Sequence, residues 1–543
     1  MKYKINRNYI ILFLLGIIIL FARSAYNFII PSMYTEDGVW ISDIINNGFF
    51  HTLVNAKGSY FVFGNIILLE VSNFLNFIFN GKNLNYLPVF VSLVQYIFMV
   101  LCSLIAVKCM EKELNKYLKF VLYLLILLVP LGFSGFEILG KISNTGYLFY
   151  FLASCLLYYR LFRKEELSKY KNLVIDFILL ICCGTNPGCY VLVGVSFIID
   201  ILMQYKFNKR NSFIETIEVY LSKLYNQLWI ILGVLCSFML FYNLVKFDLS
   251  SNGVIGNVNY SNTIEFFARA LLFYFVYPIY TFLNDKLVLI LFLVCFIVIV
   301  MAYKKGKGLE KIKLSFLLFS AVFYSLMTFF SRTTLTSHLN NYTTSWVDRY
   351  YYGINITTLL PIMYIISLFL KKQRFQKNIG YISLIILILC PLLSISYLFQ
   401  YDDAQTTVVH KIKFSDRIKN IELNDSISNY IVPIDFEGWT MNLPYDYILA
   451  SQLNQRNPES LTTSNLTDEN WENGVIRSGN ILLFDSKWLN ALNKCNVLKS
   501  EDKVVNIVEI RDAGQWIHVL CDTDDLKAFE YPNVIEFYKT GEE

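Results

Sequence analysis

Long apolar runs recur through the first 400 residues of this chain and constrain its fold more than any other feature. An α-helix needs about 20 consecutive apolar residues to cross the hydrocarbon core of a bilayer. Such runs occupy residues 9–30, 87–107, 118–134, 146–162, 173–205, 228–245, 286–303, 314–330, 353–370 and 379–399. The run at 173–205 holds two spans, broken at Asn186-Pro187-Gly188. The composition, 55% hydrophobic and 16% charged residues, excludes a water-soluble globular protein of this length. We therefore predict an all-α polytopic membrane domain over residues 1–400, with about eleven transmembrane helices.

Two further stretches, 60–79 and 264–283, are ambiguous between membrane-spanning and interfacial helices. The distribution of basic residues decides which of the two is predicted. Lys and Arg in short loops favour the cytoplasmic side of a membrane. The basic connections are 108–119, 160–171, 206–210, 304–313 and 371–377. If both ambiguous stretches crossed the membrane, the first three connections would lie outside; if neither crosses, all five lie inside. We predict a cytoplasmic N-terminus, an external C-terminus and two half-buried external helices.

The polar residues of 60–79 support an interfacial helix. Asn65, Ser72, Asn73, Asn76 and Asn80 fall on one arc of a helical wheel. The stretch is therefore predicted to be amphipathic. In 264–283, Glu265 and Arg269 have helical i, i+4 spacing, but Pro278 interrupts a short uncharged run, and a short span stays open as an alternative.

The composition changes at about residue 400. Beyond it, short β-like runs at 429–434, 480–484, 504–510 and 516–520 are separated by polar turns. We predict a small external α+β domain over residues 401–543, long enough for a core of its own. Cys495 and Cys521 lie in it, and pairing between them is left open.

Neither a cofactor nor a nucleic-acid partner is predicted. The chain has four His and no Cys/His cluster with metal-site spacing, which makes a zinc site improbable. Glu36, Asp37 and Asp43 are able in principle to hold a divalent metal, but carboxylates alone do not indicate one. The net charge of +5 comes from connections that suit an anionic lipid leaflet.

Several motifs occur in a fixed order along the predicted external loops. They are Glu36-Asp37-Gly38, Asn47-Gly48, the amphipathic stretch from Gly58-Ser59-Tyr60, Ile142-Ser143-Asn144-Thr145, Gly184-Thr185-Asn186-Pro187-Gly188 and Asp348-Arg349-Tyr350-Tyr351. In order and topology, the chain resembles the glycosyltransferase C superfamily, the multi-pass enzymes that use polyprenyl-phosphate sugars. Within it, the chain looks like bacterial O-antigen or serotype-converting glycosyltransferases.

The resemblance implies roles for particular residues. Such transfer needs a carboxylate to take the acceptor's proton and a cation to hold the departing phosphate. Asp37 would be the catalytic base, with Glu36 as its stand-in, and Arg349 would contact the lipid phosphate. Tyr350, Asn144, Lys141 and Arg269 complete the predicted substrate-binding set. The chain departs from the family at Gly146-Tyr147, where typical members carry an aromatic, and its external domain has no assignable motif, which puts acceptor recognition in doubt.

Each assignment has a structural alternative. Asp37 is a candidate N-cap for a helix beginning near Val39. Arg349 would equally pair with Asp348 or snorkel at a helix end. The i, i+4 spacing of Glu137 and Lys141 favours a local ion pair, and Glu265 with Arg269 has the same explanation.

The sequence thus predicts an inverting, integral-membrane glycosyltransferase. It would move a sugar, expected to be glucose, from a polyprenyl-phosphate (undecaprenyl-phosphate) carrier to a glycan acceptor such as the O-antigen of lipopolysaccharide, at a bacterial inner membrane. Two alternatives are an O-antigen polymerase and a lipid-linked glycan transporter or flippase. A polymerase would carry its large external region between spans, whereas this chain carries it at the C-terminus. Transporters have charges or helix breaks deep within spans. Here the charges cluster at the predicted external rim, which argues against transport, whereas the break at Asn186-Pro187-Gly188 favours it.

Overall fold

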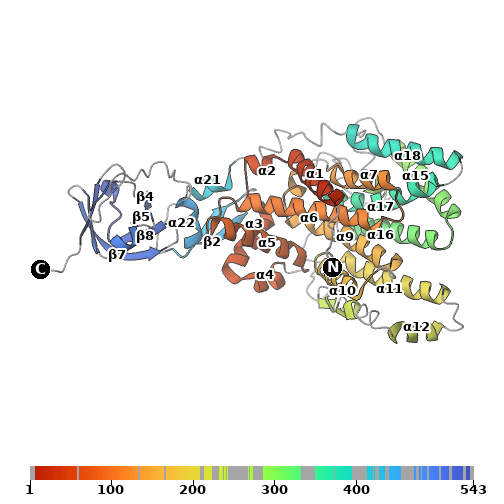
Figure 1. The fold of residues 1–543 in the computed structure, drawn as a ribbon, viewed down its shortest axis with the longest axis horizontal. Helices are drawn as coiled ribbons and strands as arrows, with labels where there is room; N and C mark the ends of the chain where they lie inside the picture. Colours follow the sequence, from red (N-terminus) through yellow and green to blue (C-terminus); the bar gives the residue numbers. More distant parts are fainter. Residues whose placement is uncertain are drawn as a thin grey trace. The chain divides into compact units, whose positions relative to one another are not determined.

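The computed structural model is mostly helical, with a small sheet-containing region at the C-terminus (Figure 1). It describes residues 7–57, 60–131, 135–163, 167–207, 213–222, 231–235, 238–239, 241–242, 267, 270–272, 285–331, 349–371, 374–393, 412–419, 421, 427–434, 439–453, 470–472, 476–478, 480–485, 488–493, 495–500, 503–512, 516–529 and 534–538. The chain divides into two compact units. The first contains residues 1–29, 47–71 and 91–409, and the second contains residues 30–46, 72–90 and 410–543.

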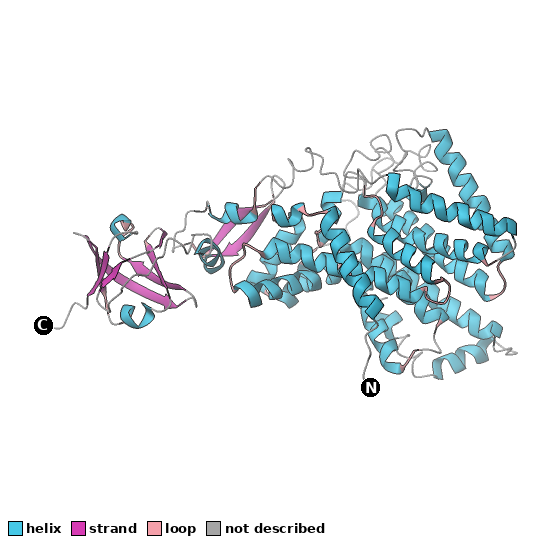
Figure 2. Cartoon of the chain, turned by 45° about the horizontal axis from the view of Figure 1, so that its top comes forward, coloured by secondary structure: helices cyan, strands magenta, loops and turns pink. Residues whose placement is uncertain are grey.

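The helices follow the apolar runs of the sequence closely. Those before residue 230 are α1 (Arg7–Arg23), α2 (Tyr26–Ile29), α3 (Thr35–Asn47), α4 (Phe49–Asn55), α5 (Phe63–Asn80), α6 (Leu87–Cys109), α7 (Lys116–Leu127), α8 (Gly135–Ile138), the 3-10 turn η2 (Ser143–Thr145), α9 (Gly146–Phe162), α10 (Lys169–Cys183), α11 (Gly188–Phe207) and α12 (Phe213–Ser222). Those after it are α15 (Asp285–Lys305), α16 (Leu309–Ser331), α17 (Arg349–Leu370) and α18 (Arg374–Leu393). Figure 2 shows them as cyan coiled ribbons, and every described strand follows α18 in the chain. The predicted helical character of these runs is confirmed, apart from the run 228–245, much of which lies outside the described residues.

Within the described residues, six helices are long and apolar enough to cross a membrane. They are α5, α6, α11, α16, α17 and α18. Length and composition are the only criteria met, so the total of about eleven spans stays a prediction. Several such helices in one chain are typical of a multi-pass membrane protein.

Helix α5 covers the stretch that the sequence predicts to be interfacial. Its mean hydropathy, 1.2, is the lowest of the six. The polar arc of the helical wheel is real: Asn65 and Asn76 are buried, whereas Phe74 and Phe77 are more than half exposed. An apolar outer face is compatible with lipid whether the helix lies in the membrane surface or crosses the membrane. The predicted interfacial placement of α5 therefore still depends on the distribution of basic residues. The other ambiguous stretch, 264–283, lies almost entirely outside the described residues.

Helix α17 is the central helix of the first unit. It packs against α7, α9, α16 and α18, and most of its side chains are buried. At 22 residues it is about 33 Å long, enough to cross the hydrocarbon core of a bilayer. Its two ends therefore belong to opposite ends of the first unit.

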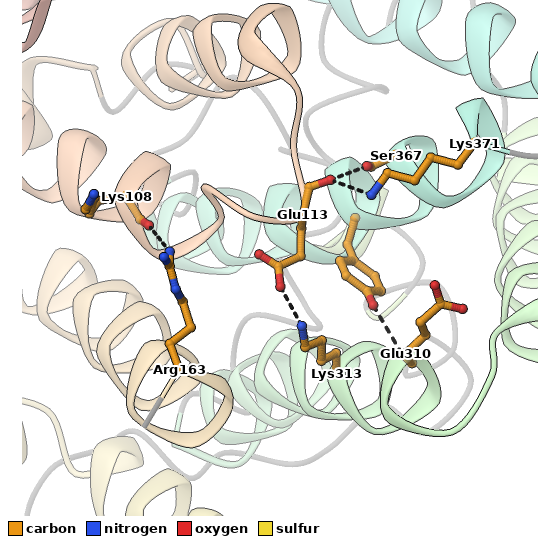
Figure 3. A network of polar contacts seen from close by, with 8 residues as sticks. Lys108, Glu113, Arg163, Glu310, Lys313, Ser367 and Lys371 are labelled. Atoms are coloured by element: carbon orange, nitrogen blue, oxygen red, sulfur yellow. Dashed lines mark hydrogen bonds and ion pairs between the residues drawn. The ribbon is translucent and has the colours of Figure 1, made fainter. Parts of the chain in front are cut away.

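The basic connections meet at the C-terminal end of α17 (Figure 3). Lys313 Nζ lies 2.6 Å from Glu113 Oε1, and both Ser367 and Lys371 donate hydrogen bonds to the Glu113 carbonyl. In the same region Arg163 donates to the Lys108 carbonyl at 3.3 Å. Four of the predicted cytoplasmic connections therefore share one end of the first unit, as the charge distribution requires.

The break between α10 and α11 joins neighbouring helices. The Thr185 hydroxyl accepts a hydrogen bond from the Gly64 amide at the start of α5, at 2.7 Å. The Asn186 side chain donates to the carbonyl of Gly146, the first residue of α9, at 3.1 Å. The Thr185 and Asn186 side chains at the break thus bind main-chain groups at the starts of two other helices.

The second unit combines helix α3 with a β-hairpin. Strands β1 (Asn429–Pro433) and β2 (Thr440–Pro444) pair antiparallel, between helices α21 (Phe414–Lys419) and α22 (Tyr445–Leu453). Asn46, near the end of α3, donates to the carbonyl of Asn442 at 2.7 Å. Lys82 lies 2.9 Å from Asp446. Residues 30–46 and 72–90 therefore pack with residues from the C-terminal region.

The last part of the chain forms a seven-stranded sheet. Its strands are β3 (Asn470–Glu472), β4 (Ile476–Ser478), β5 (Ile481–Asp485), β6 (Val497–Ser500), β7 (Lys503–Asp512), β8 (Trp516–Cys521) and β9 (Val534–Tyr538), in the order β3-β9-β6-β7-β8-β5-β4. The predicted α+β character of this region is confirmed. Cys495 and Cys521 are both free thiols, which answers the question that the sequence left open.

Candidate functional site

The Glu36-Asp37-Gly38 motif lies in the first turn of helix α3. The helix begins at Thr35, and the Gly38 amide closes its first turn by donating to the Tyr34 carbonyl at 2.9 Å. The prediction that Asp37 caps a helix beginning near Val39 is therefore wrong, because Asp37 is already inside the helix. Both carboxylates lie where the positive end of the helix dipole stabilises negative charge.

The two carboxylates differ in their surroundings. Asp37 has no exposed surface, whereas Glu36 is partly exposed. The Thr35 hydroxyl donates to Glu36 Oε2 at 2.6 Å. Solvent thus reaches Glu36 directly, whereas an acceptor hydroxyl would reach Asp37 only after the packing over it moves.

Gly38 allows close packing between α3 and the β1–β2 hairpin. A Cβ atom at this position would lie 2.6 Å from Ile434 Cδ1 and 3.0 Å from the Cγ atoms of Met33 and Met441. The glycine of the motif therefore has a packing role that is independent of chemistry.

Gly38→Ala is expected to destabilise the second unit by about 1 kcal/mol, because overpacking outweighs the better helix propensity of alanine. Gly194→Ala in α11 is the matched control, since a Cβ atom there has no neighbour within 4 Å. Thermal unfolding of the purified full chain should show opposite shifts for the two variants. A Gly38→Ala protein as stable as Gly194→Ala would contradict the packing role.

Arg349, the first residue of α17, is held by a carboxylate from a distant segment. Its Nη1 lies 3.1 Å from Glu137 Oε2, and its Nη2 donates to the Tyr350 hydroxyl at 3.2 Å. The guanidinium carbon also lies 5.1 Å from the centre of the Tyr350 ring. The Glu137 side chain is 6% exposed and that of Arg349 is 24% exposed, so the arginine is the member that solvent reaches.

Lys141 and Asn144 come from the same segment as Glu137. Lys141 is buried, and the Asn144 side chain donates to the Glu137 carbonyl at 2.7 Å. Helix α8 ends at Ile138, so Glu137 and Lys141 do not share a helix, and both are buried. The local ion pair between them stays a prediction. We call Glu137, Lys141, Asn144, Arg349 and Tyr350 the Arg349 cluster.

Among the described residues, the Arg349 cluster contains two cations, Arg349 and Lys141, and one carboxylate, Glu137. Tyr147, at the start of α9, meets the rings of Tyr350 and Tyr352 edge to face at 6.4 Å each. The ring of Tyr147 therefore lies next to the Arg349 cluster. A partly exposed guanidinium beside buried charges and aromatic rings is suited to binding a phosphate group.

The predicted site residues that the structure describes are divided between the two units. Arg349, Tyr350, Asn144 and Lys141 belong to one cluster in the first unit, whereas Glu36 and Asp37 belong to the second unit. Asp348 and Arg269 lie outside the described residues. Within the described residues, no group of three or more His, Cys, Asp and Glu side chains is arranged to hold a metal ion.

Glu137 is the residue whose role sequence reasoning missed. Its spacing to Lys141 was the only signal, and that spacing favoured a local pair. Its partner Arg349 is 212 positions away in the chain. No periodicity or charge pattern joins two residues so far apart.

Comparison with known proteins gives little beyond a distant structural likeness. No protein-family model matches the chain, and no curated protein matches it. Solved structures of an archaeal oligosaccharyltransferase resemble it. The Archaeoglobus fulgidus oligosaccharyltransferase tethered to an acceptor peptide aligns at a TM-score of 0.38 and 11% identity, over 78% of this chain and 58% of that protein. The apo form gives 0.38 and 12%, over 77% of this chain and 58% of that protein.

A third structure, AglB from the same organism with an inhibitory peptide and a dolichol-phosphate, aligns at a TM-score of 0.37 and 12% identity. It covers 76% of this chain and 57% of that protein. The chain thus spans less than two thirds of the length of these neighbours. Likeness at this level assigns neither a family nor an activity to the chain.

Proposed function

We propose that this protein is an integral-membrane glycosyltransferase that transfers a sugar from a polyprenyl-phosphate carrier to a cell-surface glycan. The observation that carries the proposal is the Arg349 cluster at the N-terminal end of α17. It places a partly exposed guanidinium at the end of a helix that is apolar enough to span a membrane. A lipid-linked phosphate has the complementary chemistry, an anion at the surface of an apolar layer.

The position of the Arg349 cluster supports an external site. The basic connections lie at the other end of α17, and positive charge in short loops favours the cytoplasm. In a bacterial inner membrane the Arg349 cluster would then face the periplasm, where a surface glycan is assembled and modified.

In the proposed reaction, the oxygen of an acceptor hydroxyl attacks the anomeric carbon of the sugar. The bond from that carbon to the phosphate oxygen breaks, its electron pair remains on the phosphate, and the configuration at the carbon inverts. Arg349 and Lys141 stabilise the charge that develops on the phosphate. Asp37 takes the acceptor proton, with Glu36 as the alternative base. The C-terminal sheet would bind the acceptor glycan, and glucose is the sugar that we expect.

The break at Gly184–Gly188 no longer favours the transporter alternative. Its Thr185 and Asn186 groups bind the starts of α5 and α9, which gives the break a structural role. In the described part of the chain, these contacts are enough to explain the break without a transport pathway.

The test is transfer of labelled sugar by the full-length protein in membrane vesicles. We expect label from undecaprenyl-phosphate glucose to enter the host's extracted surface glycan only when the protein is present. Longer glycan chains without added glucose would indicate a polymerase instead. Movement of the intact lipid across the vesicle without transfer would indicate a flippase. Either result would reject the proposal.

A further inference from the structure

The segment that carries Glu137, Lys141 and Asn144 has little regular structure of its own. Helix α8 ends at Ile138 and η2 begins at Ser143, so residues 139–142 lie outside regular helix, although the Leu139 amide still donates to the Gly135 carbonyl at 3.0 Å. Most of the segment is nevertheless buried. Buried backbone groups without partners cost free energy, so other elements must supply the partners.

Gln95 on helix α6 binds this backbone with both ends of its side-chain amide. Its Nε2 donates to the Ile138 carbonyl at 3.2 Å, and its Oε1 accepts from the Gly140 amide at 3.1 Å. Gln95 is 1% exposed. Ser92, about one helical turn earlier, donates to the Gly140 carbonyl at 3.1 Å. Helix α6 thus holds three main-chain groups within three residues of the segment.

Two more helices complete the contacts. Asn65 on α5 donates to the carbonyls of Ile142 and Ser143 at 2.6 and 3.0 Å. Asn27 on α2 donates to the Leu139 carbonyl at 2.9 Å. Together, Asn27, Asn65, Ser92 and Gln95 form what we call the amide clamp.

Gly140 fits the clamp because it has no side chain. Its φ of +77° is a conformation that residues with a Cβ atom rarely adopt. A Cβ atom there would lie 2.4 Å from Asn27 Nδ2 and 2.9 Å from Ser92 Oγ. The segment therefore has one backbone path through the clamp.

We propose that the amide clamp, and Gln95 above all, is a positioning device for the lipid-phosphate site. It holds the backbone on both sides of Lys141 and next to Glu137, which in turn holds Arg349. Gln95 itself does not touch the lipid. The inference rests on the proposed function, since it assigns the clamp to the phosphate site described there.

The test uses the full-length protein in nanodiscs and undecaprenyl phosphate without a sugar as the probe, with affinity measured by native mass spectrometry. Gln95→Met keeps the side-chain length but removes both hydrogen bonds, and we expect binding to weaken roughly tenfold. Ser103→Ala is the matched control. Ser103 is buried on the same helix, but its hydroxyl bonds only within α6, to the Met99 carbonyl. We expect its affinity to stay within about twofold of wild type.

A double variant separates positioning from general loss of stability. If Gln95 acts through the Arg349 cluster, adding Gln95→Met to Lys141→Met should weaken binding little further than Lys141→Met alone. Fully additive losses would overturn the inference. Should Gln95→Met fail to fold, Ser92→Ala removes one bond of the clamp, and a loss of roughly threefold is expected. Unchanged affinity in a folded Gln95→Met or Ser92→Ala protein would also overturn it.

The outcomes distinguish failure of the clamp from failure of the proposed function. If the wild-type protein does not bind undecaprenyl phosphate, the proposed function is wrong and the clamp has no site to position. If the wild type binds and Arg349→Ala weakens binding while Gln95→Met does not, the proposed function stands and the clamp inference fails.

Discussion

Arg349→Ala is expected to lower the rate of sugar transfer by about 100- to 1,000-fold, because in the proposed reaction it removes the main cation that stabilises the departing phosphate. It also leaves Glu137, with its 6% exposed side chain, without this ion pair. Arg349→Lys should recover only part of the rate, since an ammonium group does not bind phosphate through two parallel hydrogen bonds. Transfer of labelled sugar, normalised to the amount of folded protein, measures both effects.

Arg163→Ala is the matched control for the loss of an arginine that is paired with a glutamate. Arg163 is 7% exposed and lies 3.8 Å from Glu111, in the region of the basic connections. We expect this variant to transfer sugar at a rate within about threefold of wild type. Near-normal transfer by a folded Arg349→Ala protein would reject the phosphate role. Equal losses in the two variants would indicate a structural role for both arginines.

Asp37→Asn is expected to reduce transfer by about 100- to 10,000-fold, the usual contribution of a positioned general base. The substitution keeps the size of the side chain, which matters because Asp37 is fully buried in the first turn of α3. The measurement is again label transfer, accompanied by thermal unfolding to check the fold. Asp43→Asn, on the same helix and only partly buried, should transfer sugar at a rate close to wild type.

Glu36→Gln decides between the two acids of the motif. If this variant loses transfer and Asp37→Asn does not, the exposed carboxylate is the base and the buried one is structural. If both variants fold well and retain transfer, the motif has no catalytic role. Its residues would then serve packing alone, as Gly38 does through its close approach to the hairpin.

Much of the fold follows from local sequence signals. Helices α6, α9, α11, α16 and α17 begin and end close to the predicted runs, because the length of an apolar run is a property of neighbouring residues. The strands β1, β5, β7 and β8 overlap the predicted β-like runs for the same reason. The cap at Asp37 was predicted wrongly, because helix α3 begins two residues before it, at Thr35.

The candidate site was predictable only in part. The motif order singled out Arg349 and Asn144, and the structure brings both into contact with Glu137. The ion pair of Arg349 with Glu137 depends on how α17 packs beside the segment after α7, and local charge spacing pointed to a different partner. No sequence feature indicated a role for Gln95, because a single glutamine within an apolar run forms no pattern from which its partners can be predicted.

The sequence by itself determined where the membrane helices run, which connections are basic and where the carboxylates and cations of a transferase would be sought. Hydropathy, charge and helical period are readable within about 20 residues, so these features need no tertiary information. Tertiary structure alone decided that Asp37 is buried, that Gly38 lies under a hairpin from the C-terminal region, and that Gln95 binds the backbone beside Lys141. Each of these depends on packing between segments distant in the chain, which fixes the burial and hydrogen-bond partners of a polar group.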